Sequence, residues 1–141
     1  RVMGLFSGSG GRLALAAAAS AVGLGAPAVS QAPALAMLDS FEPGLWQLRD
    51  RDSSGGVQRI CMRDARKLIQ LRHPSASCDR VVVSDGPTEV AVQYTCRGRG
   101  YGLTRIRRET RNLFQLESQG VSDGLPFDFS AEGRRLGDCV G

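Results

Sequence analysis

The stretch RVVVSDGPTEVAVQYTCR, residues 80–97, decides the fold class because its second half alternates apolar and polar side chains with a period of two. This period is that of a β-strand with one buried face. The side chains expected on the buried face are Val90, Val92, Tyr94 and Cys96. Asp85-Gly86 is a turn signal between two strands, so the stretch predicts an antiparallel hairpin.

Similar short strands are expected on both sides of this hairpin. Two precede it, at residues 45–48 and 57–62, and two more meet near residues 110–112. In the last one, FDFSAEGRRL (127–136), Phe127, Phe129 and Ala131 alternate with polar residues. Seven short strands joined by tight turns predict a mainly β fold, an antiparallel meander in one domain.

One short α-helix is predicted between the second and third strands. Asp64 is a suitable N-cap, the helix runs through Leu71, and Pro74 prevents its continuation. Its apolar face should cover the sheet, which we expect to curl as an open half-barrel. The concave side is then either packed solid by the helix or left open as a groove for an apolar ligand.

The four cysteines, Cys61, Cys78, Cys96 and Cys139, predict two disulfides, because an even count in an exported chain is typical of a disulfide framework. There is no C-x-x-C motif and no close pair of metal ligands, so no metal or cofactor is expected. Three pairings are possible. We favour Cys61 with Cys78, which would pin the ends of the helix, and Cys96 with Cys139.

Residues 1–36 resemble a secretory signal peptide, with Arg12 followed by an apolar stretch and small residues. The apolar stretch has about 12 residues, fewer than the about 20 of a membrane-spanning helix, so we expect no anchor after cleavage. Cleavage sites of the small-x-small type follow Ala28 and Ala36. We favour Ala36, which leaves a single domain of residues 37–141.

The net charge argues against nucleic-acid binding. The formal charge of +4 falls to +2 when Arg1 and Arg12 are removed with the signal segment. Nucleic-acid binders neutralise many phosphates with a concentrated basic face, which this composition does not supply.

The assembled pattern resembles the DUF3617 family, small exported proteins of Gram-negative bacteria that form a domain of unknown function. The resemblance rests on FEPGLWQLR (41–49), on Cys61 and Cys78 around the short helix, and on VQYTCRG (92–98) with a terminal GDC (137–139). It implies a periplasmic β-rich domain and carries over no catalytic residue.

The only histidine, His73, lies with several basic residues between Cys61 and Cys78. We interpret it as an exposed residue at the helix end, because no G-x-S-x-G motif or partner base accompanies it. Its replacement by alanine is therefore expected to change almost nothing.

An arginine run provides a possible anion patch, formed by Arg105, Arg107, Arg108 and Arg111. Strand alternation places Arg105 and Arg107 on one face and Arg108 on the other. The competing interpretation is a solvated face whose arginines pair with Glu109, Glu117 or Glu132 across strands.

The remaining polar and aromatic residues favour structural roles. Asp123, Asp128 and Glu132 are close in sequence, but a glycosidase-type pair needs a defined separation and a cleft. We therefore expect turn chemistry at Asp123-Gly124 and solvation elsewhere. The aromatic residues expected in the core are Trp46, Tyr94, Tyr101, Phe127 and Phe129.

Together these features favour a non-enzymatic periplasmic or secreted binding module, expected to be a monomer. Its partner would be an envelope component or an apolar small molecule on the curved sheet. The alternative is a small periplasmic hydrolase using Asp, Glu and Arg groups that the fold brings together.

Overall fold

The structure is a computed structural model that describes residues 4, 10–11, 23–28, 33–52 and 56–140. The chain divides into two units, Arg1–Gln31 and Ala32–Gly141. In the first unit the described residues form no helix or strand, and most of the predicted signal segment lies outside the described residues. No helix in the described part of the chain is long and apolar enough to cross a membrane.

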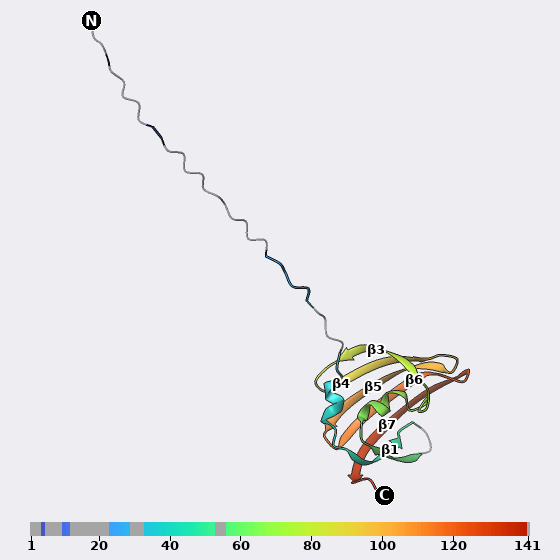
Figure 1. The fold of residues 1–141 in the computed structure, drawn as a ribbon. Helices are drawn as coiled ribbons and strands as arrows, with labels where there is room; N and C mark the ends of the chain where they lie inside the picture. The colour runs from blue at the N-terminus through green and yellow to red at the C-terminus, as the bar shows by residue number, and fades with distance from the viewer. Residues whose placement is uncertain (1–3, 5–9, 12–22, 29–32, 53–55, 141) are drawn as a thin grey trace. The chain divides into compact units, whose positions relative to one another are not determined.

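The second unit is one antiparallel sheet of seven strands with two short 3-10 helices (Figure 1). The strands are β1 (Gly44–Asp50), β2 (Val57–Met62), β3 (Cys78–Asp85), β4 (Glu89–Cys96), β5 (Gly100–Thr110), β6 (Leu113–Ser122) and β7 (Leu125–Gly137). The helices are η1 (Ala36–Ser40) and η2 (Ala65–Gln70). The mainly β meander expected from the sequence is confirmed.

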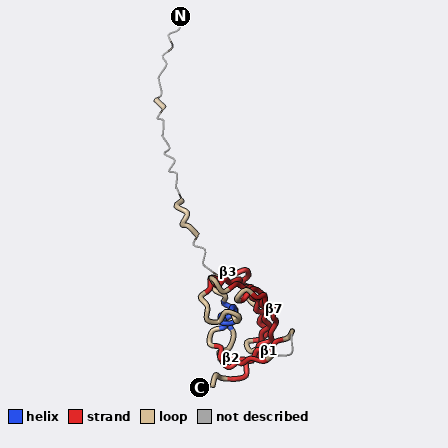
Figure 2. The backbone as a smooth tube through the Cα atoms, turned by 90° about the vertical axis from the view of Figure 1, so that its right-hand side faces the viewer, coloured by secondary structure: helices blue, strands red, loops and turns tan. Residues whose placement is uncertain are grey.

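The strand order is β2-β1-β7-β6-β5-β4-β3, so β2 and β3 are the free edges of an unclosed sheet. Only the connection from β2 to β3 passes from one edge to the other, and it carries η2. Figure 2 shows the strands curving around this helix, which lies on the concave side. The open half-barrel is therefore confirmed.

The predicted α-helix is instead a six-residue 3-10 helix. The Asp64 cap is confirmed, because its Oδ1 accepts a hydrogen bond from the Arg66 amide at 2.9 Å. The 3-10 geometry is common in helical pieces as short as this one.

The concave face is packed solid by η2 and by aromatic side chains. Leu68 and Ile69 of η2 are fully buried against the sheet. In the same core the rings of Phe41, Trp46 and Phe114 contact one another, with centroids 5.3–5.7 Å apart. Of the two alternatives left open by the sequence, the structure has the filled one.

The predicted aromatic core is only partly confirmed. Trp46, Tyr94 and Phe129 are buried, and Phe127 packs against the core from a half-buried position. Tyr101 was wrongly assigned, because its side chain is 51% exposed. It lies opposite Thr95 of β4 and Val121 of β6, on the outer face of the sheet, so the alternation of β5 points it away from η2.

Candidate functional site

All four cysteines form disulfides, but the predicted pairing is wrong: the bonds are Cys61–Cys139 and Cys78–Cys96. Cys78 and Cys96 are directly opposite each other in the β3–β4 ladder. Cys61 reaches the end of the chain because β1 pairs with β2 on one side and β7 on the other. One disulfide therefore joins β3 to β4, the other joins β2 to the segment after β7, and neither pins both ends of η2.

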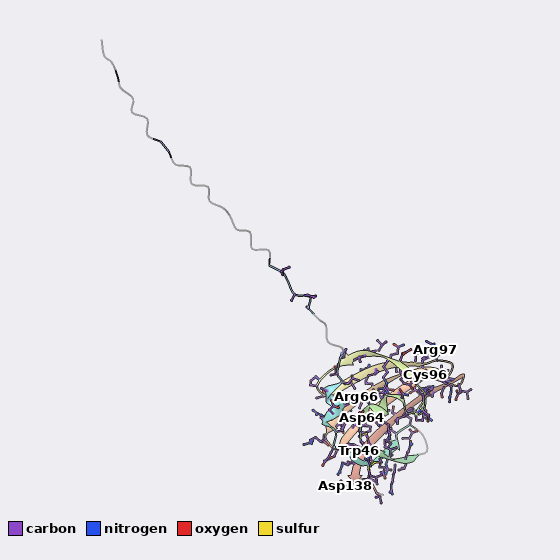
Figure 3. The ribbon with its side chains drawn as sticks, viewed as in Figure 1. Trp46, Asp64, Arg66, Cys96, Arg97 and Asp138 are labelled. Carbon is purple, nitrogen blue, oxygen red and sulfur yellow. A yellow bond between two sulfur atoms is a disulfide. The ribbon has the colours of Figure 1, made fainter. Side chains whose placement is uncertain are left out.

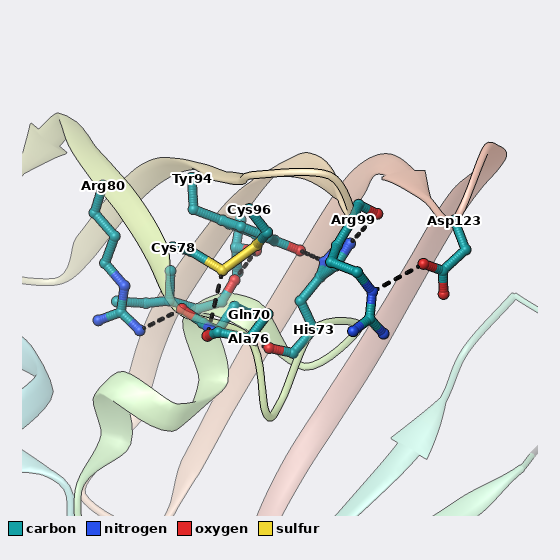
Figure 4. Close-up of a disulfide and its surroundings, with 11 residues drawn as sticks. Gln70, His73, Ala76, Cys78, Arg80, Tyr94, Cys96, Arg99 and Asp123 are labelled. Carbon is teal, nitrogen blue, oxygen red and sulfur yellow. Dashed lines mark hydrogen bonds and ion pairs between the residues drawn. A yellow bond between two sulfur atoms is a disulfide. The ribbon is translucent and has the colours of Figure 1, made fainter.

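His73 is buried, not exposed as predicted, with 4% of its surface accessible. Its Nδ1 lies 3.1 Å from the Tyr94 hydroxyl and its Nε2 lies 3.2 Å from the carbonyl oxygen of Arg99 (Figure 4). Because a carbonyl oxygen only accepts hydrogen bonds, Nε2 donates to the Arg99 carbonyl, and in the neutral imidazole Nδ1 accepts from the Tyr94 hydroxyl. These contacts tie the loop after η2 to β4 and to the turn before β5.

The surroundings of His73 and Tyr94 indicate a structural role for these two residues. Burial raises the pKa of the Tyr94 hydroxyl, an effect that nearby Arg72 partly offsets. The Tyr94 ring lies against Gly102, where an added Cβ would come within 2.6 Å of the ring. Since His73 and Tyr94 satisfy each other in a packed layer, the geometry offers a substrate no access to the imidazole.

The four arginines of the predicted anion patch lie in different surroundings. Arg105 pairs with Glu89 at 2.7 Å and Arg107 with Glu109 at 3.4 Å, both on the outer face. Arg108 lies on the core side and donates to the Ser40 hydroxyl. Arg111 is exposed in the turn after β5. Two of the four charges are thus neutralised by neighbouring carboxylates.

The three carboxylates also have separate environments. Asp123 has a positive φ of 48° in the β6–β7 turn, as expected for turn chemistry, and accepts from Arg99 at 3.0 Å. Hydrogen bonds from Gln115, and then from Arg134, lower the pKa of Glu132. Asp128 lies on the outer face, opposite Gln119.

A groove lined mainly by basic side chains lies beside η2, where the helix meets both free edges of the sheet. We call it the basic groove; its volume is about 490 Å³. It is lined by Cys61 of β2, by Arg63, Asp64, Arg66 and Lys67, and by Arg80 of β3. Figure 3 shows Asp64 and Arg66 close together at this place.

Arg66 is the neutralised cation of the basic groove. Its guanidinium contacts Asp39 at 2.7 Å and Asp64 at 3.3 Å, and it also donates to the Ala34 carbonyl at 2.7 Å. The hydrogen bond from Arg66 lowers the pKa of Asp39, and the same bond raises the pKa of Arg66.

The other three cations of the basic groove have no carboxylate partner among the described residues. Lys67 donates to the Cys61 carbonyl at 3.3 Å, and Arg80 donates to the Gln70 amide oxygen at 2.8 Å (Figure 4). Arg63 is exposed and makes no side-chain hydrogen bond or ion pair within the described part of the chain. Neutral acceptors orient Lys67 and Arg80 without cancelling their charge.

Part of this cluster is visible in the sequence, because several basic residues lie between Cys61 and Cys78. The sequence alone explains the stretch as a helix whose ends a disulfide would pin. What local reasoning missed is Arg80, which the β2–β3 crossover brings to the same groove, and the neutral partners of Lys67 and Arg80.

A second depression, of about 370 Å³, lies on the outer face over β5, β6 and β7. It brings together Arg105, Glu117 and Asp128. Glu117 of β6 is opposite Arg105 of β5, and Asp128 of β7 is the diagonal neighbour of Glu117. Within the described residues, no group of three His, Cys, Asp or Glu side chains is arranged to hold a metal ion.

Comparison with known protein families gives a match over most of the chain. The family described as "Protein of unknown function (DUF3617)" matches residues 41–139. No curated protein matches the chain.

Proposed function

Because the chain belongs to the DUF3617 family, whose function is unknown, we propose a function from its own surface: an exported, non-enzymatic module that binds an anionic ligand in the basic groove. The observation that carries the proposal is the set of three cations, Arg63, Lys67 and Arg80, without carboxylate partners in the described structure. Elsewhere on the sheet, Arg105 and Arg107 are paired with glutamates.

The physical argument concerns charge compensation. An arginine already paired with a glutamate has its positive charge largely compensated, so an incoming anion gains less electrostatic attraction from it. Lys67 and Arg80 are held by a carbonyl and an amide, so an incoming anion meets positive charge that is already in position. Such charge-assisted hydrogen bonds are roughly twice as strong as neutral ones.

The ligand class follows from the donors. Arginine presents a planar fork suited to phosphate or carboxylate oxygens, and lysine acts as a point charge. Two arginines and one lysine around an open groove suit a group with several anionic oxygens. A phosphate-bearing envelope component, either a lipid headgroup or a soluble phosphate ester, has this chemistry.

An apolar ligand on the concave face is less well supported, because η2 occupies that space. Leu68 and Ile69 are fully buried there, and Thr104 donates to the Ile69 carbonyl. A depression beside Leu71 and Phe129 has a volume of about 130 Å³, and one beside Leu38, Phe41 and Met62 has a volume of about 330 Å³ but is also lined by charged side chains. A fatty acyl chain would have to displace the helix.

Export to the periplasm is part of the proposal. Two disulfides without free cysteines among the described residues are compatible with an oxidising compartment. In a Gram-negative envelope, phosphate-bearing lipids and glycans are abundant, so an anion-binding module would meet its ligand there.

The test compares vesicle binding by two triple variants with equal charge change. The groove variant is Arg63→Gln, Lys67→Gln and Arg80→Gln, and the matched control is Arg105→Gln, Arg107→Gln and Arg111→Gln. We expect the wild type and the control to bind phosphatidylglycerol vesicles, and the groove variant to bind at least about tenfold more weakly, the effect of losing 1.4 kcal/mol. Equal weakening of both variants would mean that general charge, not the groove, drives binding.

Two further arms separate the possible sources of phosphate. Phosphatidylcholine vesicles should bind weakly, and excess glycerol 1-phosphate should compete with phosphatidylglycerol vesicles. If glycerol 1-phosphate binds while neither vesicle does, the ligand is a soluble phosphate ester. If no arm shows binding, the proposal is wrong.

A second candidate function, a small hydrolase, is favoured by one observation: Arg105, Glu117 and Asp128 line the same outer-face depression. Diagonal neighbours across strands are typically about 7–8 Å apart, a separation that an acid–base carboxylate pair can use. Against it, the depression is open to water, whereas active sites gain from excluding water. Turnover of 4-nitrophenyl glycosides or esters that is lost in Glu117→Gln would favour the hydrolase; we expect no turnover.

A further inference from the structure

The N-terminal segment 34–40 belongs to the folded core of the domain. Leu35, Met37 and Leu38 are 6%, 4% and 2% exposed, and all three are members of the hydrophobic core. They precede Phe41, which contacts the rings of Trp46 and Phe114. The compact unit accordingly begins at Ala32, five residues before the boundary expected from the sequence.

Polar contacts hold the same segment in place. The Leu35 amide donates to Asp85 at the end of β3, at 3.2 Å, and the Leu35 carbonyl accepts from Leu38 at 3.0 Å. Arg66 of η2 donates to the Ala34 carbonyl at 2.7 Å. Leu35 also has a left-handed backbone, with a φ of 54°. A non-glycine residue keeps this conformation only where its surroundings fix it.

Cleavage after Ala36 would cut through this arrangement. It would remove the buried Leu35 side chain and the Ala34 carbonyl, and it would place a new ammonium group on Met37 at the first turn of η1. A positive charge at the start of a helix is unfavourable. Asp85 and Arg66 would each lose a partner.

The site after Ala28 carries none of these costs. Ala26 and Ala28 are small residues at the two positions that a signal peptidase reads, and residues 23–28 are all exposed. We infer that export processing occurs after Ala28 and leaves segment 34–40 on the mature protein. The inference rests on the proposed export.

Retaining this segment also matters for the basic groove. Asp39 and the Ala34 carbonyl fix the guanidinium of Arg66, which forms one wall of the groove. The mature N-terminal segment is therefore part of the ligand-binding structure, and a chain beginning at Met37 would lose one of the two contacts.

The test is the intact mass of the exported protein, expressed as the full chain in a Gram-negative host and purified from the periplasm. We expect a mature chain that begins directly after Ala28. A mature chain beginning at Met37 would overturn the inference. A chain that is not exported or not cut would contradict the proposed export itself, so the two failures are distinguishable.

Two matched substitutions complete the test. Ala28→Leu removes the small residue that the inferred site requires, so uncut precursor should accumulate. Ala36→Leu changes an exposed residue and should leave processing and mass unaffected, apart from the substitution itself. If Ala36→Leu blocks processing while Ala28→Leu does not, cleavage occurs after Ala36 and the inference is wrong.

Discussion

His73 shows how one residue depends on contacts that no local pattern reveals. On the sequence it is a polar residue between Arg72 and Pro74, typical of an exposed helix end. In the structure its side chain is 4% exposed and forms hydrogen bonds with the Tyr94 hydroxyl and the Arg99 carbonyl. Both partners lie more than 20 residues away in sequence, at separations of 21 and 26.

We predict that His73→Ala destabilises the protein by about 2–3 kcal/mol, because it removes two hydrogen bonds and leaves a buried hydroxyl unsatisfied. Denaturant unfolding measures this change. In a double-mutant cycle with Tyr94→Phe, the two losses should be less than additive. A loss below about 0.5 kcal/mol, as at an exposed site, would show that the buried position is wrong.

A second residue-scale prediction concerns acid. The hydrogen bond from Arg66 lowers the pKa of Asp39, so the folded state binds this proton less readily than the unfolded state. The stability from this pair is therefore fully present above the unfolded pKa of about 4, and it is lost as the pH falls through the folded pKa. Carboxyl NMR titration should show Asp39 below its usual range.

The control for this titration is Arg66→Gln, which should return the Asp39 pKa towards its ordinary value. Glu132 provides an internal reference, because its pKa is lowered mainly by Gln115 and Arg134 and should not respond to this substitution. An Asp39 titration that is unchanged by Arg66→Gln would contradict the ion pair.

At the scale of elements, the strands and most of their neighbours were predictable, and the pairing of β1 with β7 was not. Alternation of apolar residues marks some strands locally, as in residues 90–96 of β4. The position of β1 between β2 and β7 depends on contacts between residues far apart in sequence, and it brings Cys61 close to Cys139. One signal was available for the other bond: Cys78 begins β3 and Cys96 ends β4 of the same predicted hairpin.

The disulfides predict graded losses of stability. On the chain-entropy account, Cys78→Ala with Cys96→Ala removes a bond of separation 18, worth about 3 kcal/mol. Removing Cys61 and Cys139, of separation 78, should cost up to about 4.5 kcal/mol. Unfolding of the two double variants measures both values.

A non-reducing peptide map checks the pairing directly. It should recover a Cys61 peptide linked to the Cys139 peptide, and a Cys78 peptide linked to the Cys96 peptide. Recovery of a Cys61–Cys78 link would restore the pairing expected from the sequence and contradict the fold.

For the molecule as a whole, the decisive feature is that η2 fills the half-barrel. The sequence left a filled and an empty concave face equally possible, because the curvature of a sheet depends on all of its strands together. We predict that Leu68→Ala lowers the free energy of unfolding by about 2–5 kcal/mol, since it leaves a cavity in place of a fully buried side chain. Val81→Ala, at a position 65% exposed, is the matched control and should stay within about 0.5 kcal/mol.

The same whole-molecule view explains what the sequence could say about the candidate site. The arginine run at residues 105–111 is the most visible concentration of positive charge in the sequence. Whether an arginine is paired with a carboxylate depends on residues distant in sequence, such as Glu89, which lies 16 residues from Arg105. The basic groove emerges only when β2, η2 and β3 are placed together.

The most direct test of the basic groove is an NMR titration of the isotope-labelled protein with glycerol 1-phosphate. We predict saturable shifts of the Arg63, Lys67 and Arg80 signals, with the signals of Arg105, Arg107 and Arg111 unmoved. Saturable shifts confined to the outer face, or no saturable shift at all, would contradict the assignment of anion binding to this groove.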